Sequence, residues 1–422
     1  MSVHLKQEEF RLRQEKRKIA LKRAKELKAR ITDYLENKDQ IKNGFEVQEQ
    51  YNRAKQTLLN FFNADNEQWE NWHWQMANRI KDVKVISQLI DLSPAEKEAI
   101  EKVGRQYRWA VSPYYMALAM VSGSGGPVWL QAIPCIEEVK DRYGVEDPMG
   151  EEYTSPVEGV TRRYPDRLII NVTNQCAMYC RHCQRRRNIG EIDVHKSRKV
   201  LEGALQYIRE NKEIRDVLIT GGDALLLSDR QIEWLLTELD NIPHVEIKRL
   251  GTRTPVTMPQ RITPELCKIL ENHPPIYINT QFNHPLEVTP EAKKACDMLV
   301  KAGVVLGNQA VLLKNINNQP DVMKRLNQSL LTIRVRPYYI FHAKAVKGTR
   351  HFITGVDDGI AIMEQLRGYT SGLAVPTYII NAPNGYGKTP VLPQYIIENK
   401  NDQVTLRTWE KRIIPYNISG KH

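Results

Sequence analysis

The stretch Arg167-Leu-Ile-Ile-Asn-Val-Thr-Asn-Gln-Cys176-Ala-Met-Tyr-Cys180-Arg-His-Cys183 joins a β-rich run to three closely spaced cysteines. Thiolates spaced C-x-x-x-C-x-x-C are typical ligands of iron, and a cluster of four irons usually takes four protein ligands. With three cysteines, one iron would stay open for another ligand, as catalytic metal sites keep a vacant position. The alternative is a zinc site that uses His182 or a distant cysteine, but the chain lacks the second cysteine pair of a zinc ribbon.

Outward from this stretch, short β-rich runs alternate with helical segments. We expect strands at 167–173, 215–220, 245–250, 276–281, 304–312 and 333–341. Helical patterns lie between them, for example at 196–211, 229–240 and 289–302. Six β-then-α units indicate a parallel sheet, which could be either a curved partial barrel or an open doubly wound sheet.

Polar and unusual residues gather where these strands end. Cys176 follows the first strand, and Gly221-Gly222-Asp223 follows the second. Residues 279–284 span the end of the fourth strand, 307–309 interrupt the fifth, and 338–344 span the end of the sixth. The active site of a parallel α/β barrel forms at that face. The pattern therefore favours an α/β fold built on a partial (β/α)6 TIM-like barrel.

The remaining segments are expected to surround this barrel. Residues 1–60 are predicted to form a basic helical arm, with 15 Lys and Arg against 9 Asp and Glu out of a net charge of +11 for the chain. Residues 61–160 are predicted to be a helical region packed on the barrel at 161–345, and 346–422 a C-terminal region. A basic arm could touch nucleic acid, but a solvated helix is the more ordinary interpretation.

The composition also suggests where the protein acts. The chain has no apolar run near ~18 residues and no signal-like N-terminus, so we expect no membrane span and a cytoplasmic location. Three of its six cysteines crowd into eight residues. In a cytosolic chain such clustering indicates a metal site rather than disulfides.

Several motifs together resemble the radical S-adenosylmethionine (SAM) superfamily and, within it, the lysine 2,3-aminomutase family. The cysteine spacing and Leu218-Ile-Thr-Gly-Gly-Asp223 carry the superfamily resemblance. The narrower resemblance runs from about residue 66 to 415. It rests on the stretches Arg163-Tyr-Pro-Asp-Arg167, Cys183-Gln-Arg-Arg-Arg187, Gly251-Thr-Arg-Thr-Pro255, Asn279-Thr-Gln-Phe-Asn-His-Pro285, Gly307-Asn-Gln309, Arg336-Pro-Tyr-Tyr339 and Gly387-Lys-Thr-Pro390.

The resemblance implies three cofactors. A [4Fe–4S] cluster would bind Cys176, Cys180 and Cys183. Pyridoxal 5′-phosphate (PLP) would bind covalently to Lys388, the expected catalytic lysine. Further residues match positions that contact cofactors: Arg163, Tyr164 and Arg167 for PLP, and Gly221, Gly222, Asp223, His284 and Gln309 for SAM. Guanidinium groups suit phosphate oxygens because they bind them in pairs.

A second motif near Lys388 offers a competing interpretation. Ala382-Pro-Asn-Gly-Tyr-Gly-Lys-Thr389 fits a relaxed phosphate-loop pattern. A true phosphate loop opens a helix whose N-terminus faces the phosphates. Pro390 and Pro393 follow here among β-rich residues, so we expect no helix and no nucleotide triphosphatase.

Two substitutions indicate the substrate. The resemblance implies that lysine enzymes of the family hold the substrate ammonium with two aspartates, and Lys344 and Asn381 stand at those positions. A buried ammonium needs anionic or carbonyl partners, whereas Lys344 and Asn381 offer donors suited to a carboxylate. Arg185 matches the position that binds the α-carboxylate. The expected reaction is therefore an isomerisation that moves the amino group of L-glutamate from carbon 2 to carbon 3, giving β-glutamate.

Other features set the remaining expectations. The family's lysine enzymes have a cysteine-built zinc site near the C-terminus, but no cysteine follows Cys296 here, so no zinc is expected. We expect an external electron donor and a homo-oligomer, and consider nucleic acid an improbable partner. The alternatives are a lysine or arginine aminomutase, in which Lys344 points into solvent, or a radical SAM enzyme that modifies a macromolecule.

Overall fold

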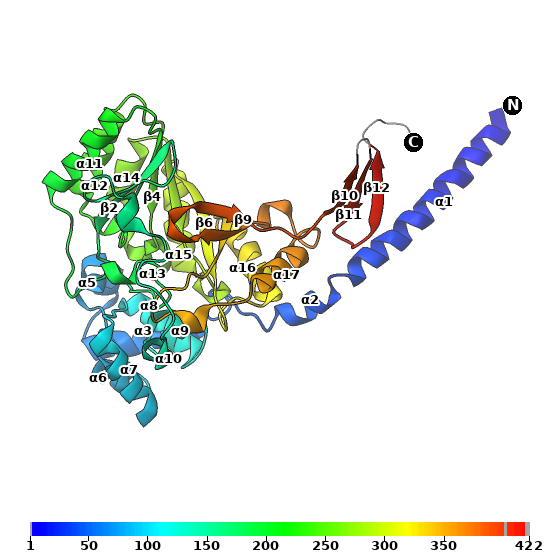
Figure 1. Ribbon diagram of the computed structural model, residues 1–422. Helices are drawn as coiled ribbons and strands as arrows, with labels where there is room; N and C mark the ends of the chain where they lie inside the picture. Colours follow the sequence, from blue (N-terminus) through cyan, green and yellow to red (C-terminus); the bar gives the residue numbers. More distant parts are fainter. Residues whose placement is uncertain (1, 401–402, 418–422) are drawn as a thin grey trace. The chain divides into compact units, whose positions relative to one another are not determined.

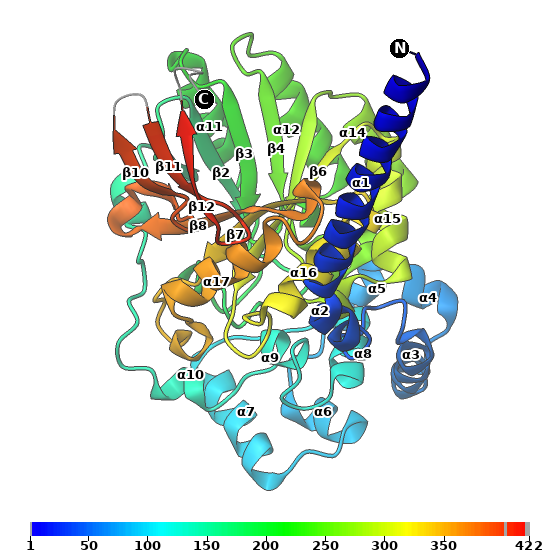
Figure 2. The same ribbon diagram turned by 90° about the vertical axis from the view of Figure 1, so that its right-hand side faces the viewer.

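The computed structural model describes residues 2–400 and 403–417, which fall into two compact units, Met1–Lys42 and Asn43–His422 (Figures 1 and 2). The first unit contains helices α1 (Ser2–Ala29) and α2 (Thr32–Lys38). The helical arm predicted at 1–60 is therefore not one helix, because the next helix, α3, spans Gln48–Phe62. A non-helical stretch lies between them, and within it a side chain at Gly44 would come within 2.6 Å of the Val288 carbonyl oxygen.

Helix α3 belongs to the second unit, although the sequence places it in the basic arm. Its Tyr51, Leu58 and Leu59 are buried in the main core. Short helices follow: α4 (Asn66–Glu70), α5 (Trp72–Ala77), α6 (Val83–Leu89), α7 (Pro94–Gln106), α8 (Pro113–Ser122), α9 (Trp129–Ala132) and α10 (Glu137–Lys140). Polar side chains cap the starts of α4 to α8, and at α7 Ser93 and Glu96 form a reciprocal capping box. These helices confirm the helical character expected before the barrel.

A nine-stranded sheet forms the centre of the second unit, with its strands paired in chain order. The seven strands β2 to β8 are parallel, and β1 and β9 add antiparallel edges. The strands are β1 (Val160–Thr161), β2 (Arg167–Thr173), β3 (Asp216–Gly221), β4 (Ile247–Gly251), β5 (Ile276–Thr280), β6 (Val305–Leu312), β7 (Arg336–His342), β8 (Thr377–Ala382) and β9 (Gly387–Pro390). The first and last strands do not pair, so the sheet is a curled partial barrel, which confirms the predicted fold class.

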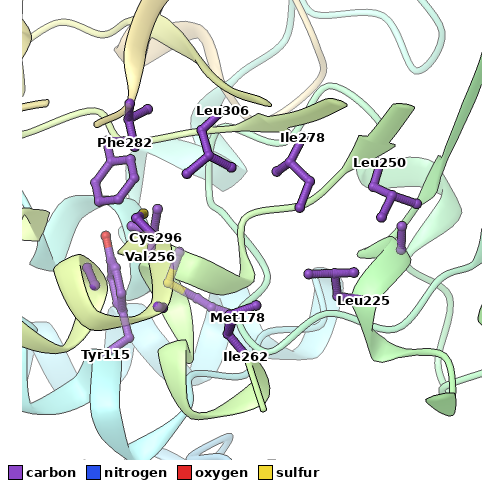
Figure 3. Close-up of a cluster of buried hydrophobic side chains, with 14 of the residues drawn as sticks. Tyr115, Met178, Leu225, Leu250, Val256, Ile262, Ile278, Phe282, Cys296 and Leu306 are labelled. Atoms are coloured by element: carbon purple, nitrogen blue, oxygen red, sulfur yellow. The ribbon is translucent and has the colours of Figure 1, made fainter. Parts of the chain in front are cut away.

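Strand alternation separates a packed face from a face that lines a pocket. Leu250, Ile278 and Leu306 are buried on neighbouring strands (Figure 3). Their neighbours Arg249 and Asn279 line the pocket on the other face. Because successive side chains of a strand point to opposite faces of the sheet, one face packs in the core while the other lines the pocket.

Helices between the strands cover the packed face. They are α11 (Arg198–Glu210), α12 (Asp229–Asp240), α13 (Thr254–Thr257), α14 (Pro264–Glu271), α15 (Pro290–Lys301), α16 (Pro320–Thr332) and α17 (Val356–Leu366). In Figure 3, Val256 of α13 and Cys296 of α15 lie in the same cluster as the strand residues. The helices predicted at 196–211, 229–240 and 289–302 are thereby confirmed to within a few residues.

The C-terminal segment extends the sheet and then forms a second one. Strands β8 and β9 continue the sheet beyond residue 345. Strands β10 (Ile396–Lys400), β11 (Gln403–Arg407) and β12 (Ile413–Asn417) form a separate antiparallel sheet. Lys388 lies in strand β9, so the structure has no helix where a phosphate loop would need one.

Among the described residues, every helix is too short or too polar to cross a lipid bilayer.

Buried ion pairs fasten the cysteine loop to the helical region. The carboxylate of Glu138, on α10, accepts hydrogen bonds from Arg181 Nε at 3.0 Å and Nη2 at 2.6 Å, and another from Arg186. Glu138 is fully buried and Arg181 is 1% exposed. Burial alone would raise the pKa of Glu138, but the charges of Arg181 and Arg186 hold that pKa below its usual value. The chain on both sides of Cys183 is therefore tied to α10.

We predict that Glu138→Gln destabilises the protein by about 3–5 kcal/mol, because it leaves buried guanidinium groups without a counter-charge. The free energy of unfolding from urea denaturation would measure the loss. Glu137→Gln is the matched control, since Glu137 pairs with Lys140 on the exposed side of the same helix. We expect the control to change stability by no more than ~0.5 kcal/mol. Equal stability of the two variants would contradict the role given to Glu138.

Candidate functional site

A pocket of about 330 Å³ opens at the carboxyl ends of the parallel strands. Its walls come from the loops after β2, β3, β4 and β5, the ends of β7 and β8, and strand β9. Nearly all the site residues predicted from the sequence line it. These are Cys176, Cys180, Cys183, Arg163, Tyr164, Arg167, Arg185, Gly221, Gly222, Asp223, Gln309, Lys344, Asn381 and Lys388. The sheet thus brings together side chains that lie up to 225 residues apart in the sequence.

The three predicted cluster cysteines lie on the loop between β2 and α11. Cys180 Sγ accepts a hydrogen bond from Arg253 Nη1 at 2.8 Å. Burial raises the pKa of Cys176 well above its usual value, and the charge of Asp223 adds to this. Three half-buried thiols in one loop fit an iron–sulfur cluster, whose positive irons stabilise the thiolate form.

Within residues 2–400 and 403–417, no group of three or more His, Cys, Asp or Glu side chains could hold a single metal ion. A multi-iron cluster spreads its ligands over several metals, so its thiolates need not converge on one point. The expectation that this chain binds no zinc stays a prediction.

The Gly221-Gly222-Asp223 loop packs directly against the cysteine loop. A side chain at Gly222 would come within 2.3 Å of the Gln175 carbonyl oxygen, so only glycine allows this approach. Asp223 is buried and accepts hydrogen bonds from the Thr252 hydroxyl at 2.5 Å and the Arg253 backbone N–H at 2.8 Å. Burial raises the pKa of its carboxyl group. Asp223 therefore joins the loops after β3 and β4.

Two residues expected near SAM have different positions. Gln309 lies in β6 at a register shift and lines the pocket. His284 is buried outside the pocket lining, and its Nδ1 accepts a hydrogen bond from the Leu286 backbone N–H at 3.2 Å. Burial lowers the pKa of His284 to about 3, which keeps the ring neutral. His284 caps the short 3-10 helix that follows it, and its predicted contact with SAM stays a prediction.

Lys388 and Tyr164 meet at one end of the pocket. The Lys388 backbone N–H donates to the Tyr164 hydroxyl at 3.0 Å, and Lys388 Nζ lies 5.2 Å from the centre of the Tyr164 ring. Arg167 stacks on the same ring at 4.0 Å. Although Lys388 is exposed as a residue, its side chain lines the pocket. Burial of its ammonium, with the charges of Arg167 and Arg249, lowers the pKa of Lys388 to about 8.

This end of the pocket fits PLP. Arginine side chains and an aromatic ring suit the phosphate and the pyridine ring. A lysine with a lowered pKa loses its proton readily, as an amine that forms a covalent bond to an aldehyde must.

Lys344 lines the same part of the pocket as Lys388, since both ammonium groups lie near the Phe341 ring. Its ammonium group donates a hydrogen bond to Gln184 Oε1 and lies 5.6 Å from the centre of the Phe341 ring. Burial and the charges of Arg185 and Arg163 lower the pKa of Lys344 to about 7. Its hydrogen-bond partner is a neutral amide, so the positive charge is not cancelled locally.

Asn381 stands opposite Lys388 in the pairing of β8 with β9. Its Nδ2 is buried and has no hydrogen-bond partner. Three more buried polar atoms without partners belong to pocket-lining residues, namely His182 Nδ1, Asn279 Nδ2 and Thr280 Oγ1. Buried polar groups are nearly always paired, so orphaned atoms at a pocket indicate groups that await a ligand.

Several pocket residues were not predicted as site residues. Gln184, which binds Lys344, follows Cys183 directly, and its place beside the motif could have suggested a role. Arg249 lines the pocket from β4 and pairs with Asp216 at 2.7 Å. Glu151 binds three arginines behind the pocket, and it lies in a segment that carries no motif recognisable from the sequence alone.

Comparisons with known proteins agree with this site. The Radical SAM superfamily model matches residues 170–323, and the lysine-2,3-aminomutase model matches residues 363–420. The chain is 58% identical to glutamate 2,3-aminomutase of Clostridioides difficile, over 95% of each chain. It is 49% identical to L-lysine 2,3-aminomutase of Fusobacterium nucleatum, over 85% of each chain. It is 46% identical to L-lysine 2,3-aminomutase of Clostridium subterminale, over 87% of this chain and 88% of that one.

These matches confirm the resemblance inferred from the sequence, together with the cofactor set of [4Fe–4S] cluster, SAM and PLP. The chain therefore belongs to the lysine 2,3-aminomutase family of radical SAM enzymes, and it is an isomerase of the aminomutase class.

Proposed function

We propose that this enzyme moves the amino group of L-glutamate from carbon 2 to carbon 3 and releases β-glutamate. The observation that carries the proposal is the position of Lys344, whose ammonium lies in the pocket against a neutral partner. A substrate ammonium would meet like charge there, whereas a side-chain carboxylate would find an ion-pair partner. The relative with 58% identity is named for glutamate, which supports the same substrate.

Asn381 supports a carboxylate in the same place. Its unpaired Nδ2 is a donor, and a carboxylate oxygen is an acceptor that could satisfy it. We propose that Lys344 and Asn381 together bind the γ-carboxylate. Arg185, which also lines the pocket, is proposed to bind the α-carboxylate, because a guanidinium matches the two oxygens of a carboxylate.

We assign the other pocket residues by the same chemistry. Cys176, Cys180 and Cys183 would hold the cluster. Gly221, Gly222, Asp223 and Gln309 would surround SAM, and the contact of His284 with SAM stays a prediction. Arg163, Tyr164 and Arg167 would orient PLP, with Lys388 attached to it.

When bound, the cluster and SAM supply radical hydrogen abstraction, and PLP carries the migrating nitrogen. The chain's own residues would hold the substrate by both of its carboxylates. Buried walls exclude water, which protects reactive species and strengthens the ion pairs at both carboxylates. The neutral form of Lys388 is accessible near neutral pH because its pKa lies at about 8.

Partners and location follow from the chemistry. The cluster needs electrons, so we propose an external electron donor in addition to the small amino-acid substrate. All six cysteines are free thiols, which supports the proposed cytoplasmic location, where disulfides are rare.

The test of the proposal is product analysis by NMR on protein reconstituted without oxygen, with iron, sulfide, PLP, SAM and a strong reductant. We expect β-glutamate from L-glutamate, and no β-lysine from L-lysine. The double variant Lys344→Asp/Asn381→Asp should lower kcat/KM for glutamate by about 100-fold, because it places carboxylates against the γ-carboxylate.

Turnover of L-lysine by the unaltered enzyme would overturn the substrate assignment. It would not contradict the assigned cofactor sites. Cleavage of SAM without turnover of either amino acid would point to a different substrate. Arg209→Lys is a matched control, since Arg209 pairs with Glu238 on the outer helices, away from the pocket.

We predict that the KM for L-glutamate rises with pH above about 7, because Lys344 binds a carboxylate only while protonated, and its pKa lies at about 7. The limiting slope is about tenfold per pH unit. The charged groups that face Lys344 are Arg185, Arg163, Lys388 and Glu151. Of these, Lys388 also titrates, with a pKa of about 8.

Initial rates measured at several pH values distinguish the titration of Lys344 from that of Lys388. The Lys344 effect should fall on KM, and Lys344→Met should remove it while raising KM at low pH. A pH-independent KM in the unaltered enzyme would contradict the prediction.

We further propose that copies of the chain assemble through the C-terminal sheet. The register of β10, β11 and β12 aligns Ile396, Leu406 and Ile414 on one face. Ile396 and Ile414 are exposed by 56% and 40%. We predict that Ile414→Glu lowers the mass measured by light scattering, while Ile413→Glu, which lies on the opposite face of the same strand, does not. A monomeric parent protein would rule out this assembly.

A further inference from the structure

Glu151 lies at the centre of a group of arginines behind the pocket. It begins the short 3-10 helix η1 (Glu151–Thr154) and is only 6% exposed. Its Oε1 accepts hydrogen bonds from Arg163 Nη2 and Arg185 Nη2, both at 2.9 Å. Its Oε2 accepts from Arg187 Nη2, also at 2.9 Å. One carboxylate therefore contacts both an arginine assigned to PLP and the arginine assigned to the substrate.

The contact with Arg185 fixes the orientation of the guanidinium group. Arg185 Nε lies 3.1 Å from Glu151 Oε1, so Nε and Nη2 on one edge both donate to the same carboxylate. Two bonds on one edge of a planar group hold its plane and leave the opposite edge available. Arg185 lines the pocket, and the groups of its guanidinium that do not bind Glu151 stay available for a substrate carboxylate.

The charge of Glu151 also offsets the repulsion among the pocket cations. Arg163, Arg185 and Lys388 each lower the pKa of Lys344, whereas Glu151 raises it. Burial alone would raise the pKa of Glu151. The charges of Arg185, Arg163 and Arg187 outweigh burial and hold that pKa below its usual value. A buried anion among cations stabilises their close approach, and removing it leaves them uncompensated.

The backbone beside Glu151 contacts the loop that carries Lys388. The 3-10 turn η8 (Pro383–Gly385) precedes β9, and the Asn384 backbone N–H donates to the Pro148 carbonyl oxygen at 3.2 Å. Asp147 accepts from the Glu151 backbone N–H at 2.6 Å and pairs with Arg187 at 3.1 Å. The segment around Glu151 thus connects the lysine loop, the PLP arginine and the substrate arginine.

We propose that Glu151 is a positioning residue that aligns Arg163 toward PLP and Arg185 toward the α-carboxylate, and so couples cofactor binding to substrate binding. This inference rests on the proposed function for the identity of the substrate. Glu151 touches neither ligand in this arrangement and acts only through the two arginines.

The test compares Glu151→Gln with the unaltered chain. We expect roughly a tenfold rise in the Kd for PLP and a similar rise in the KM for L-glutamate, because hydrogen bonds to charged groups contribute about that much. PLP binding is followed by visible absorbance on the full chain after removal of PLP, so this result does not depend on turnover. Glu151→Asp keeps the charge and should recover part of the PLP affinity, and it also serves if the Gln variant does not fold.

Glu152→Gln is the matched control, since Glu152 is the exposed neighbour of Glu151. We expect unchanged constants in that variant. A rise in only one of the two constants would overturn the coupling, and tighter glutamate binding would show that Glu151 competes with the substrate instead of positioning Arg185. Failure of the unaltered enzyme to convert glutamate, with a weakened Kd for PLP in Glu151→Gln, would overturn the proposed substrate and not the link to Arg163.

Discussion

Parallel pairing of seven consecutive strands is the constraint on which the rest of this structure depends. When neighbouring strands run in the same direction, their carboxyl ends meet at one edge of the sheet, and the loops that follow them converge. Cys176 after β2, Gly222 after β3 and Lys344 after β7 reach one pocket for this reason alone. The same pairing requires helical crossovers, whose apolar sides form the core around Leu250, Ile278 and Leu306.

The site concentrates positive charge, and the protein balances it with a few buried carboxylates. Glu138 neutralises Arg181 and Arg186 beneath the cysteine loop. Glu151 neutralises arginines on the other side of the same loop. Both carboxylates lie behind the pocket, so the surface that faces the ligands keeps its positive character. This arrangement suits anionic ligands such as a phosphate and carboxylates, because a buried charge is stable only when a partner is close.

Selectivity within the family can be understood as a difference in charge at one end of the pocket. Gln184 accepts a hydrogen bond from the Lys344 ammonium through a neutral oxygen, which does not cancel the charge of Lys344. A carboxylate in the place of Gln184 would cancel that charge. Under the proposed function, discrimination between a γ-carboxylate and an ammonium comes from attraction to one and repulsion of the other.

The sequence by itself determined the strand pattern, the three closely spaced cysteines and the set of residues at the strand ends, because these depend on local periodicity and on motifs of fixed spacing. It also indicated the proposed role of Lys344 and Asn381, because both residue types offer hydrogen-bond donors that suit a carboxylate. It did not reveal the break in the N-terminal helices around Gly44, which depends on a contact with Val288 more than 240 residues away. The sequence also did not predict that His284 lies outside the pocket lining, or that Glu151 binds arginines of the site. Those features depend on which side chains lie within hydrogen-bonding distance, and only the tertiary structure decides this. Glu151, for example, is buried and accepts hydrogen bonds from three arginines.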